Sequence, residues 1–402
     1  MRVLVVQSEL GVLRGGGENF TRNLFQSFAE RGHQVWATFI ADSKGQYPLA
    51  LPPTFRALPL AGCWSRKLGQ DALSTMAGWM PQRTKIRAHW DRVQAAICWR
   101  TVRWHDRRFT RRVEVEFRGR WKEFDAVYVH QSTLLATRIA PFCPTMLRLP
   151  GPISEDLAPA LKSIRVVCAN GDALRQIRQL IGEHACELPI GLDGELFKPG
   201  ASGIRQSIGW TKENWVIGYV GRLAYVKGVD LLARAFTKIR RTLPQARLLF
   251  IGSGEEQGKL RSCLREELAQ GIVRLEPDVP HASLPEWYRA MDLFVMPSRY
   301  ENYSNAALEA LACGVPFLAS AIGGNQRLAD TQGGWLFSHG SEESLAERLQ
   351  AIVGNRQAAL ERGLVGGQKV REMYSWSYSA GRLETMLEQV RSAGGRDVVC
   401  TP

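Results

Sequence analysis

Apolar residues occur in blocks of strand length that alternate with blocks of helical spacing through the first half of the chain. Arg2–Gln7 is a run of aliphatic and β-branched residues, as expected of a buried strand. A glycine-rich turn at Gly11–Gly17 follows, and then a helix whose C-terminal stop is Gly32. The apolar positions of this helix share one face: Phe20, Leu24, Phe25 and Phe28. Further strands are predicted at Gln34–Ile40, Asp125–His130 and Ile164–Ala169. Near-continuous apolar strands separated by helices predict a parallel sheet with helices on both faces.

The same alternation begins again after Pro189–Trp210, a stretch rich in Gly and Pro that predicts a domain boundary. The strands predicted beyond it are Trp215–Val220, Arg247–Ile251, Leu293–Met296 and Pro316–Ser320. Helices are predicted at Val229–Thr242 and Asn305–Ala312. We therefore expect an α/β protein with two Rossmann-like, doubly wound parallel-sheet domains, residues 1–190 and 191–375, that face a central cleft. In such folds ligands bind at the carboxyl ends of the strands.

The composition is that of a folded protein, because 45% of the 402 residues are apolar and 23% are charged. The eight cysteines include no C-x-x-C pair, which argues against a disulfide framework or a zinc cluster and favours buried thiols in a reducing compartment. Neither a signal peptide nor a run of 18 apolar residues is evident. The expected location is the cytoplasm, with peripheral contact to the inner membrane as an option.

Positive charge is concentrated in one segment of the chain. The net charge is +13, and residues 83–122 carry 13 basic residues against four acidic ones. Four tryptophans lie among them: Trp90, Trp99, Trp104 and Trp121. Basic residues mixed with tryptophan suit an anionic membrane surface. An equally good interpretation is a solvated helical insertion, at about residues 61–122, whose tryptophans belong to the core. Nucleic-acid binding is not expected, because no known module surrounds these residues.

Two glycine-containing turns are candidate phosphate sites. Gly15, Gly16 and Gly17 lie between the first strand and the first helix, where backbone N–H groups can approach a phosphate or a sugar. This turn matches neither G-x-G-x-x-G nor the P-loop, and a purely structural tight turn explains it as well. Arg222 and Lys227 follow the first strand of the second half, beside a helix N-terminus, and favour a diphosphate. The alternative is that both cations are solvated surface charges.

Two glutamates follow a buried strand of the second half. Glu301 lies in the loop after Pro297–Ser298, and Glu309 lies within the following helix, which begins at Asn305 directly after Ser304. A loop carboxylate can bind sugar hydroxyls, and a helical carboxylate can accept hydrogen bonds from a ribose diol. By themselves, two glutamates at this spacing are usually surface residues.

These segments, taken in order, resemble the retaining, nucleotide-sugar-dependent family 4 glycosyltransferases of the GT-B fold. The resemblance is strongest from about residue 215 to 350 and rests on G-R-L-x-x-x-K-G at Gly221–Gly228, Glu-x7-Glu at Glu301–Glu309, Gly314–Pro316 and Gly323–Asn325. It implies that Arg222 and Lys227 hold the donor diphosphate, with Glu309 on the ribose and Glu301 on the transferred sugar. The glycines of the first turn, with Ser304 and Asn305, would complete the donor site. His130 would face the donor sugar, and the segment 376–402 would form a helix that crosses back to the first domain.

The resemblance implies a transferase that retains the anomeric configuration. We expect a glycan or lipid-linked acceptor, used in lipopolysaccharide or exopolysaccharide synthesis at the cytoplasmic membrane face; the alternatives are a soluble acceptor or a non-catalytic sugar-nucleotide or nucleic-acid binding protein. The chain contains no Asp-x-Asp element, so we expect neither a metal nor another cofactor. Asn302, Arg327 and Ile190 depart from residues usual in the family.

Overall fold

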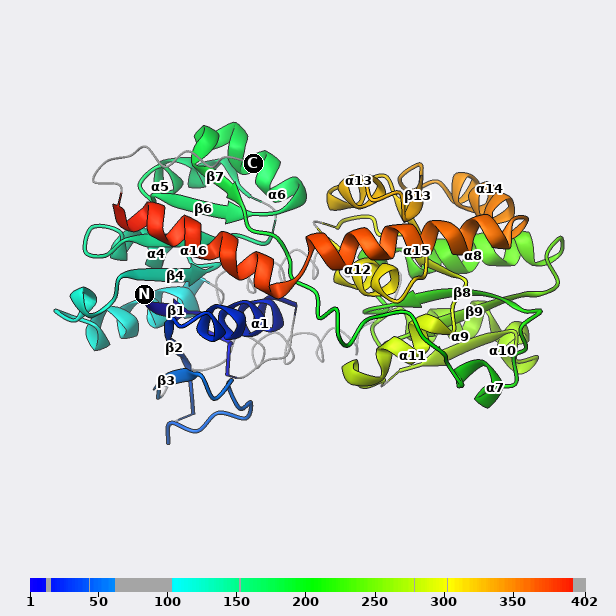
Figure 1. Cartoon of the computed structure of the whole chain (residues 1–402), viewed down its shortest axis with the longest axis horizontal. Coiled ribbons are helices and arrows are strands. Elements are labelled where there is room, and N and C mark those ends of the chain that lie inside the picture. The colour runs from blue at the N-terminus through cyan, green and yellow to red at the C-terminus, as the bar shows by residue number, and fades with distance from the viewer. Residues whose placement is uncertain are drawn as a thin grey trace, which may run out of the picture. The chain divides into compact units, whose positions relative to one another are not determined.

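A computed structural model describes residues 1–11, 16–42, 44–61, 103–151, 153–277, 279–301 and 303–392 of the chain. The chain divides into two compact units (Figure 1). The first unit consists of Met1–Pro189 together with Trp376–Pro402, and the second consists of Ile190–Ser375. Each unit is built on one parallel sheet, and the two are described separately below.

The first unit contains a seven-stranded parallel sheet in the order β3-β2-β1-β4-β5-β6-β7. Its strands are β1 (Arg2–Val6), β2 (Gln34–Ile40), β3 (Phe55–Leu60), β4 (Ala126–His130), β5 (Thr145–Arg148), β6 (Val166–Ala169) and β7 (Ala185–Glu187). The helices of this unit include α1 (Gly16–Glu30), α4 (Thr133–Ile139), α5 (Ala158–Leu161), α6 (Gly171–Ile181) and α16 (Trp376–Ser392). Among the described residues of this unit, turns of 3-10 helix lie at η1 (Trp121–Glu123), η2 (Glu155–Leu157) and η3 (Gly182–His184).

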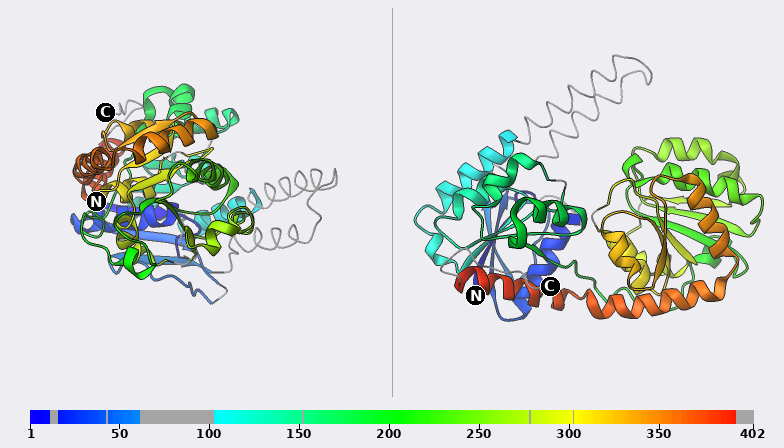
Figure 2. Two further views of the ribbon diagram at one scale, coloured as in Figure 1. Left: turned by 90° about the vertical axis from the view of Figure 1, so that its right-hand side faces the viewer. Right: turned by 90° about the horizontal axis from the view of Figure 1, so that it is seen from above.

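The second unit contains a six-stranded parallel sheet in the order β10-β9-β8-β11-β12-β13. Its strands are β8 (Trp215–Val220), β9 (Ala246–Ile251), β10 (Val273–Glu276), β11 (Leu293–Met296), β12 (Phe317–Ser320) and β13 (Gly334–Phe337). Its helices are α7 (Ile204–Ser207), η4 (Tyr225–Lys227), α8 (Val229–Arg240), α9 (Gln257–Cys263), α10 (Arg265–Ala269), η5 (His281–Ser283), α11 (Leu284–Arg289), α12 (Asn305–Ala312), α13 (Gly324–Ala329), α14 (Glu342–Val353) and α15 (Arg356–Met373). Figure 2 shows helices on both faces of this sheet.

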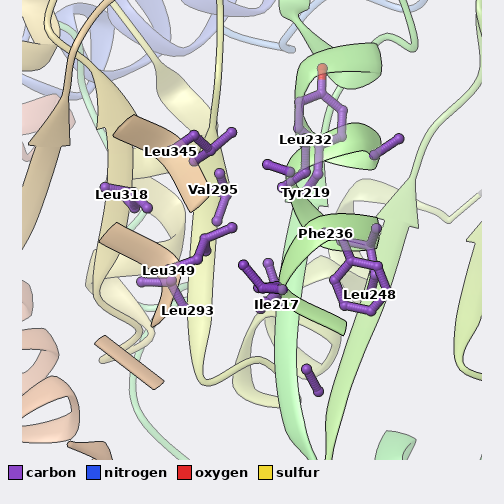
Figure 3. Close-up of a cluster of buried hydrophobic side chains, with 14 of the residues drawn as sticks. Ile217, Tyr219, Leu232, Phe236, Leu248, Leu293, Val295, Leu318, Leu345 and Leu349 are labelled. Atoms are coloured by element: carbon purple, nitrogen blue, oxygen red, sulfur yellow. The ribbon is translucent and has the colours of Figure 1, made fainter. Parts of the chain in front are cut away.

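The core of the second unit explains why its strands are almost wholly apolar. One face of the sheet presents Ile217, Leu248, Leu293 and Val295, which pack against α8 and α14 (Figure 3). Strands buried on both faces have no exposed side that polar residues could occupy. The fold class predicted from the sequence, two doubly wound parallel sheets, is confirmed. In each sheet the first strand has later strands on both sides, and this leaves a topological switch point at β1/β4 and at β8/β11.

Helix α16 belongs to the first unit and packs beside α1. The Trp376 ring meets Phe20 edge-on at 5.7 Å between centroids. Glu384 accepts hydrogen bonds from the Arg31 guanidinium at 2.9 and 2.7 Å and lies 2.9 Å from His33 Nε2. Helix α16 therefore contributes both an aromatic packing contact and a polar cluster around Glu384 to the first unit.

The basic segment 83–122 is described from residue 103 onward, and Trp90 and Trp99 lie outside the described residues. Residues 103–116 are helical. Trp121 is 8% exposed and packs on Phe117, whereas Trp104 is 52% exposed. The buried Trp121 therefore fits the interpretation of these tryptophans as core residues, and the exposed Trp104 fits the interpretation as a surface for membrane contact.

The cysteines differ in part from the expectation. Cys143, Cys168 and Cys313 are buried free thiols, as predicted. Cys263 is free but exposed, and Cys186 is disulfide-bonded, so the prediction of a small buried thiol is wrong for these two residues.

Candidate active site

The candidate site of the second unit lies at the switch point between β8 and β11. The two strands are parallel neighbours, with Leu293 opposite Ile217. The chain leaves β8 through η4 into α8, and it leaves β11 through residues 297–304 into α12. The carboxyl ends of both strands therefore bring these two loops to one edge of the sheet, where ligands of doubly wound folds bind.

Lys227 and Glu301 form an ion pair between the two loops. Lys227 Nζ donates to Glu301 Oε2 at 2.7 Å, with the side chains 29% and 12% exposed. Their loops are in direct backbone contact, because Gly228 has φ 68° and a Cβ atom there would lie 1.9 Å from the Pro297 carbonyl oxygen. Only glycine fits this position, since a larger residue would both strain the backbone and overlap Pro297. The close approach of the two loops thus places a cation and a carboxylate side by side.

Arg299 holds the same two loops together. Its guanidinium donates to both carboxylate oxygens of Asp230, at 2.7 and 2.8 Å, and to the Tyr225 carbonyl at 2.6 Å. It also lies over the Tyr225 ring, 3.8 Å from the centroid. Burial alone would raise the pKa of Asp230, but hydrogen bonds from Arg299 and Arg234 outweigh burial and lower the pKa. Sequence reasoning missed this clamp, because nothing in the spacing of Arg299 and Asp230 shows that they meet.

Arg222 follows β8 directly and is exposed. Its backbone carbonyl accepts a hydrogen bond from the Tyr219 hydroxyl at 2.8 Å, which fixes the turn after the strand. Burial raises the pKa of Tyr219, so this hydroxyl stays a neutral donor. Among the described residues no carboxylate pairs with the Arg222 side chain, which leaves its guanidinium available to an anion.

Glu309 is held in place by an aromatic and a histidine side chain. The Tyr288 hydroxyl donates to Oε2 at 2.8 Å, and His281 Nε2 lies 3.0 Å from Oε1. The hydrogen bond to Glu309 raises the pKa of His281, against the opposing effect of burial. Burial also raises the pKa of Tyr288. The buried Phe197 ring packs against both partners. His281 and Tyr288 precede Glu309 by more than twenty residues, and no motif in the sequence points to either of them.

The remaining candidates of the second unit occupy the start of α12 and the turn after β12. The Ser304 hydroxyl is buried and caps α12 by accepting the Ala307 N–H at 3.1 Å, and Asn305 is exposed in the first turn. Asn325 donates to the Ser320 carbonyl at 3.0 Å. Arg327 is exposed on α13, and Asn302 lies outside the described residues.

The first unit has a polar pocket at its own switch point, between β1 and β4. It is lined by Gln7, Ser8, Glu9, Glu18, Ile40, His105, Asp106, Arg108, Phe109, His130, Gln131 and Ser132. His130 is buried at the end of β4, with Nδ1 3.4 Å from the Tyr128 hydroxyl. A Cβ atom on Gly17 would lie 3.0 Å from His130 Nε2, so glycine keeps space beside this ring.

The structure separates the predicted residues into two sets. In the second unit Lys227 and Glu301 pair with each other, Arg222, Ser304 and Asn305 lie along the segments that follow β8 and β11, and Glu309 lies further along α12 beside His281 and Tyr288. Gly16, Gly17 and His130 belong to the first unit, where Gly16 begins α1, and Gly15 lies outside the described residues. Among the described residues no three His, Cys, Asp or Glu side chains gather as metal ligands. Likewise, no described helix has both the length and the apolar character needed to span a membrane.

Sequence comparison identifies a family for part of the second unit and relatives for a longer part of the chain. Residues 214–355 match the family described as "Glycosyl transferases group 1". D-inositol 3-phosphate glycosyltransferase 1 of Catenulispora acidiphila is 32% identical over 263 residues, which cover 61% of this chain and 62% of that protein. A GDP-mannose-dependent monoacylated alpha-(1-6)-phosphatidylinositol monomannoside mannosyltransferase of Corynebacterium glutamicum is 30% identical over 233 residues, covering 54% and 59%. The chain therefore spans about three fifths of the length of these relatives.

Structure comparison covers nearly the whole chain. Sucrose-phosphate synthase of Thermosynechococcus elongatus superposes with a TM-score of 0.75 over 98% of this chain and 100% of that one, at 19% sequence identity. At this identity the similarity establishes the fold. The family match shows that residues 214–355 form a group 1 glycosyltransferase domain, and the structural similarity shows that the whole chain has the GT-B fold, as the resemblance of its motifs predicted.

Proposed function

We propose that the protein is a glycosyltransferase that moves a sugar from a nucleotide-sugar donor to a hydroxyl group of an acceptor. The ion pair between Lys227 and Glu301 is the observation that carries this proposal. The reaction breaks the bond between the anomeric carbon and the diphosphate, where positive charge develops on the sugar and negative charge on the leaving group. A cation and a carboxylate 2.7 Å apart suit the two ends of that bond.

The positive charges of the second unit support a mechanism in which side chains stabilise the leaving group. Lys227 and the exposed Arg222 would bind the diphosphate, and Glu309, oriented by Tyr288 and His281, would accept hydrogen bonds from the ribose. His130 keeps the role that the family resemblance gives it, a contact with the transferred sugar. In our proposal the departing diphosphate takes the proton of the acceptor hydroxyl on the same face. The bond to the acceptor oxygen then forms with retention and without a covalent intermediate on the enzyme, and neither a metal ion nor another cofactor takes part.

The proposed acceptor is a lipid-linked or polysaccharide glycan at the cytoplasmic face of a membrane. Two observations support it. A groove beside the helix 103–116 is lined largely by arginines, namely Arg107, Arg111, Arg118 and Arg138, and such a surface suits lipid phosphates. The mannosyltransferase of Corynebacterium glutamicum is named for a phosphatidylinositol-linked acceptor. The second candidate is a soluble acceptor, which the relative named for inositol 3-phosphate favours.

The donor half of the proposal is tested by calorimetry with UDP, GDP, ADP, CDP and dTDP, followed by transfer and donor-hydrolysis assays with the matching nucleotide sugars. We expect one of these nucleotides to bind, and we expect Lys227→Ala and Arg222→Ala to lower turnover by about 100-fold or more. Lys238→Ala is the matched control, because Lys238 of α8 pairs with Glu342 of α14 and not with a residue of the two loops. Unchanged turnover in both loop variants, or loss of activity in EDTA, would contradict the mechanism.

The membrane half is tested by sedimentation with phosphatidylcholine vesicles with and without phosphatidylglycerol. We expect binding only to the anionic vesicles, weakening as salt rises. The variant Arg107→Gln/Arg111→Gln/Arg118→Gln should bind less than the control Arg261→Gln/Arg265→Gln, which changes exposed arginines of the second unit. Equal binding of both variants would remove the arginine groove from the proposal.

A further inference from the structure

The ion pair between Lys227 and Glu301 joins two groups that the proposed function assigns to different parts of the donor, the diphosphate and the sugar. The Lys227 ammonium donates to the Glu301 carboxylate at 2.7 Å, and the side chains are 29% and 12% exposed. Water and salt screen such a pair less than they screen a pair on the surface. A diphosphate that binds Lys227 must therefore compete with the carboxylate that holds it.

Glu301 is the partner that loses more when the pair opens. Lys227 exchanges one anion for another, because phosphate oxygens accept charged hydrogen bonds as carboxylate oxygens do. Among the described residues, Lys227 is the one hydrogen-bond donor to Glu301. A largely buried carboxylate that loses its donor is unfavourable, and Glu301 would in addition lie close to the negative charge of the diphosphate.

The backbone around the pair keeps Glu301 from moving away. Gly228 touches the Pro297 carbonyl so closely that a Cβ atom there would lie 1.9 Å from its oxygen. The Arg299 backbone N–H, two residues before Glu301, donates to the Val226 carbonyl at 2.9 Å. The two loops are thus joined on either side of Lys227, and Glu301 stays beside the site of the diphosphate.

An intact nucleotide sugar and a free nucleoside diphosphate differ in how they replace this pair. The nucleotide sugar supplies an anion to Lys227 and hydroxyl donors to Glu301, so both partners are satisfied again. The nucleoside diphosphate satisfies Lys227 alone and leaves the carboxylate without a donor. The exchange is therefore balanced for the donor and unbalanced for the product that remains after transfer.

We infer that the Lys227–Glu301 pair makes the site select an intact nucleotide sugar over the nucleoside diphosphate that the reaction releases. This inference rests on the proposed glycosyltransferase function and extends it from the binding of the donor to the rejection of the product. The pair forms again as the nucleoside diphosphate leaves, and its formation favours product release.

The affinity for the nucleoside diphosphate alone tests this inference, because a residue that only contacts the sugar would not change it. Calorimetry would use UDP, GDP, ADP, CDP and dTDP with the whole protein. We expect Glu301→Gln to bind the preferred nucleoside diphosphate about tenfold more tightly than the unaltered protein does. Glu301→Asp keeps the charge but is one methylene shorter and loses the contact with Lys227, so we expect a gain of about threefold.

Glu361→Gln is the matched control for the loss of one negative charge. Glu361 lies on α15, where it accepts a hydrogen bond from Gln357 at 2.8 Å, and its replacement should leave the affinity unchanged. The nucleotide sugar that the donor-hydrolysis assay identifies is measured in the same way. We expect its advantage over the nucleoside diphosphate to shrink by at least about tenfold in Glu301→Gln.

Three results would overturn the inference. The first is unchanged or weaker binding of the nucleoside diphosphate to Glu301→Gln, with its unfolding temperature preserved. The second is a gain in Glu301→Gln with none in Glu301→Asp, which would assign the effect to repulsion by the charge and not to the ion pair. The third is the absence of binding of all five nucleoside diphosphates to both proteins, and this result alone would also contradict the proposed function.

Discussion

Replacing Arg299 by Met should impair the reaction more than it destabilises the fold. The change removes the guanidinium that bridges Asp230 and the Tyr225 carbonyl and keeps an unbranched apolar chain. Hydrogen bonds to charged groups contribute about 1.5–3 kcal/mol each when buried. Asp230 keeps its bond from Arg234, at 3.1 Å, and water reaches the site because the Arg299 and Asp230 side chains are 23% and 20% exposed. We therefore expect a loss of about 1–2 kcal/mol in the free energy of unfolding, or about 2–8 °C in the unfolding temperature.

The effect on the reaction follows from where Arg299 is attached. Tyr225 lies two residues before Lys227 in η4, and the Arg299 backbone N–H donates to the Val226 carbonyl at 2.9 Å. Without the clamp the Lys227 ammonium can move relative to Glu301 and to the diphosphate. A displacement of about 1 Å in a catalytic group can lower the rate about 100-fold. We expect kcat/KM to fall by about 10- to 100-fold in Arg299→Met.

A double-mutant cycle separates positioning from general destabilisation. Steady-state transfer would be measured for Arg299→Met, Lys227→Ala and the combined variant, using the donor that calorimetry identifies. If Arg299 acts through Lys227, the combined variant should be no slower than Lys227→Ala alone. Arg234→Met is the control, because Arg234 bonds to Asp230 and Glu342 but to neither loop. Full additivity of the two losses, or an equal loss in Arg234→Met, would refute the positioning role.

Three further predictions follow from single contacts in the second unit. Gly228→Ala should destabilise it by several kcal/mol, on the order of 3, while Gly258→Ala, with open space around it, should not; thermal unfolding by circular dichroism compares them. Tyr288→Phe should weaken nucleoside diphosphate binding about tenfold in calorimetry, because Glu309 loses an orienting donor, and unchanged affinity would remove Glu309 from the ribose site. Hydrogen bonding to Glu309 raises the pKa of His281, so this pair stabilises the fold below the unfolded pKa and loses that effect as pH rises through the folded pKa. His281→Gln should therefore lower the unfolding temperature more at pH 5.5 than at pH 8, and a deficit that is larger at pH 8 would contradict the pairing.

The sequence predicts strands well where they are buried on both faces and poorly where they are short or lie at an edge. Trp215–Val220 and Leu293–Met296 are central strands, and the structure places β8 and β11 at those residues. The edge strand β3 has the sequence FRALPL, whose Arg and Pro interrupt the apolar run. β7 has only three residues, ACE. Such strands depend on pairing with a neighbour already in place, and this tertiary information is not contained in their own pattern.

The candidate site shows the same division between local and distant information. Arg222, Lys227 and Glu301 could be proposed from the sequence because each follows a recognisable strand end. The clamp from Arg299 to Asp230 and the support of Glu309 by His281 and Tyr288 join elements far apart in the chain, and a polar residue at such a position is usually a surface residue. The acidic lining of the first pocket was also hidden, because it opposes the net charge of the segment that supplies Asp106.

That opposition changes how the overall charge should be interpreted. A net charge of +13 acts over a distance and attracts anionic partners to the surface, whereas selection of a reacting group depends on the side chains within hydrogen-bond reach. In the first unit the pocket includes the carboxylates Glu9, Glu18 and Asp106, which can accept hydrogen bonds from hydroxyls, and at the loops of the second unit Arg222 and Lys227 are the donors that we propose for phosphate. A nucleotide sugar contains both kinds of group and a polyol only one. The side chains of the second-unit loops, and not the net charge, therefore carry the proposed assignment of the diphosphate to Arg222 and Lys227.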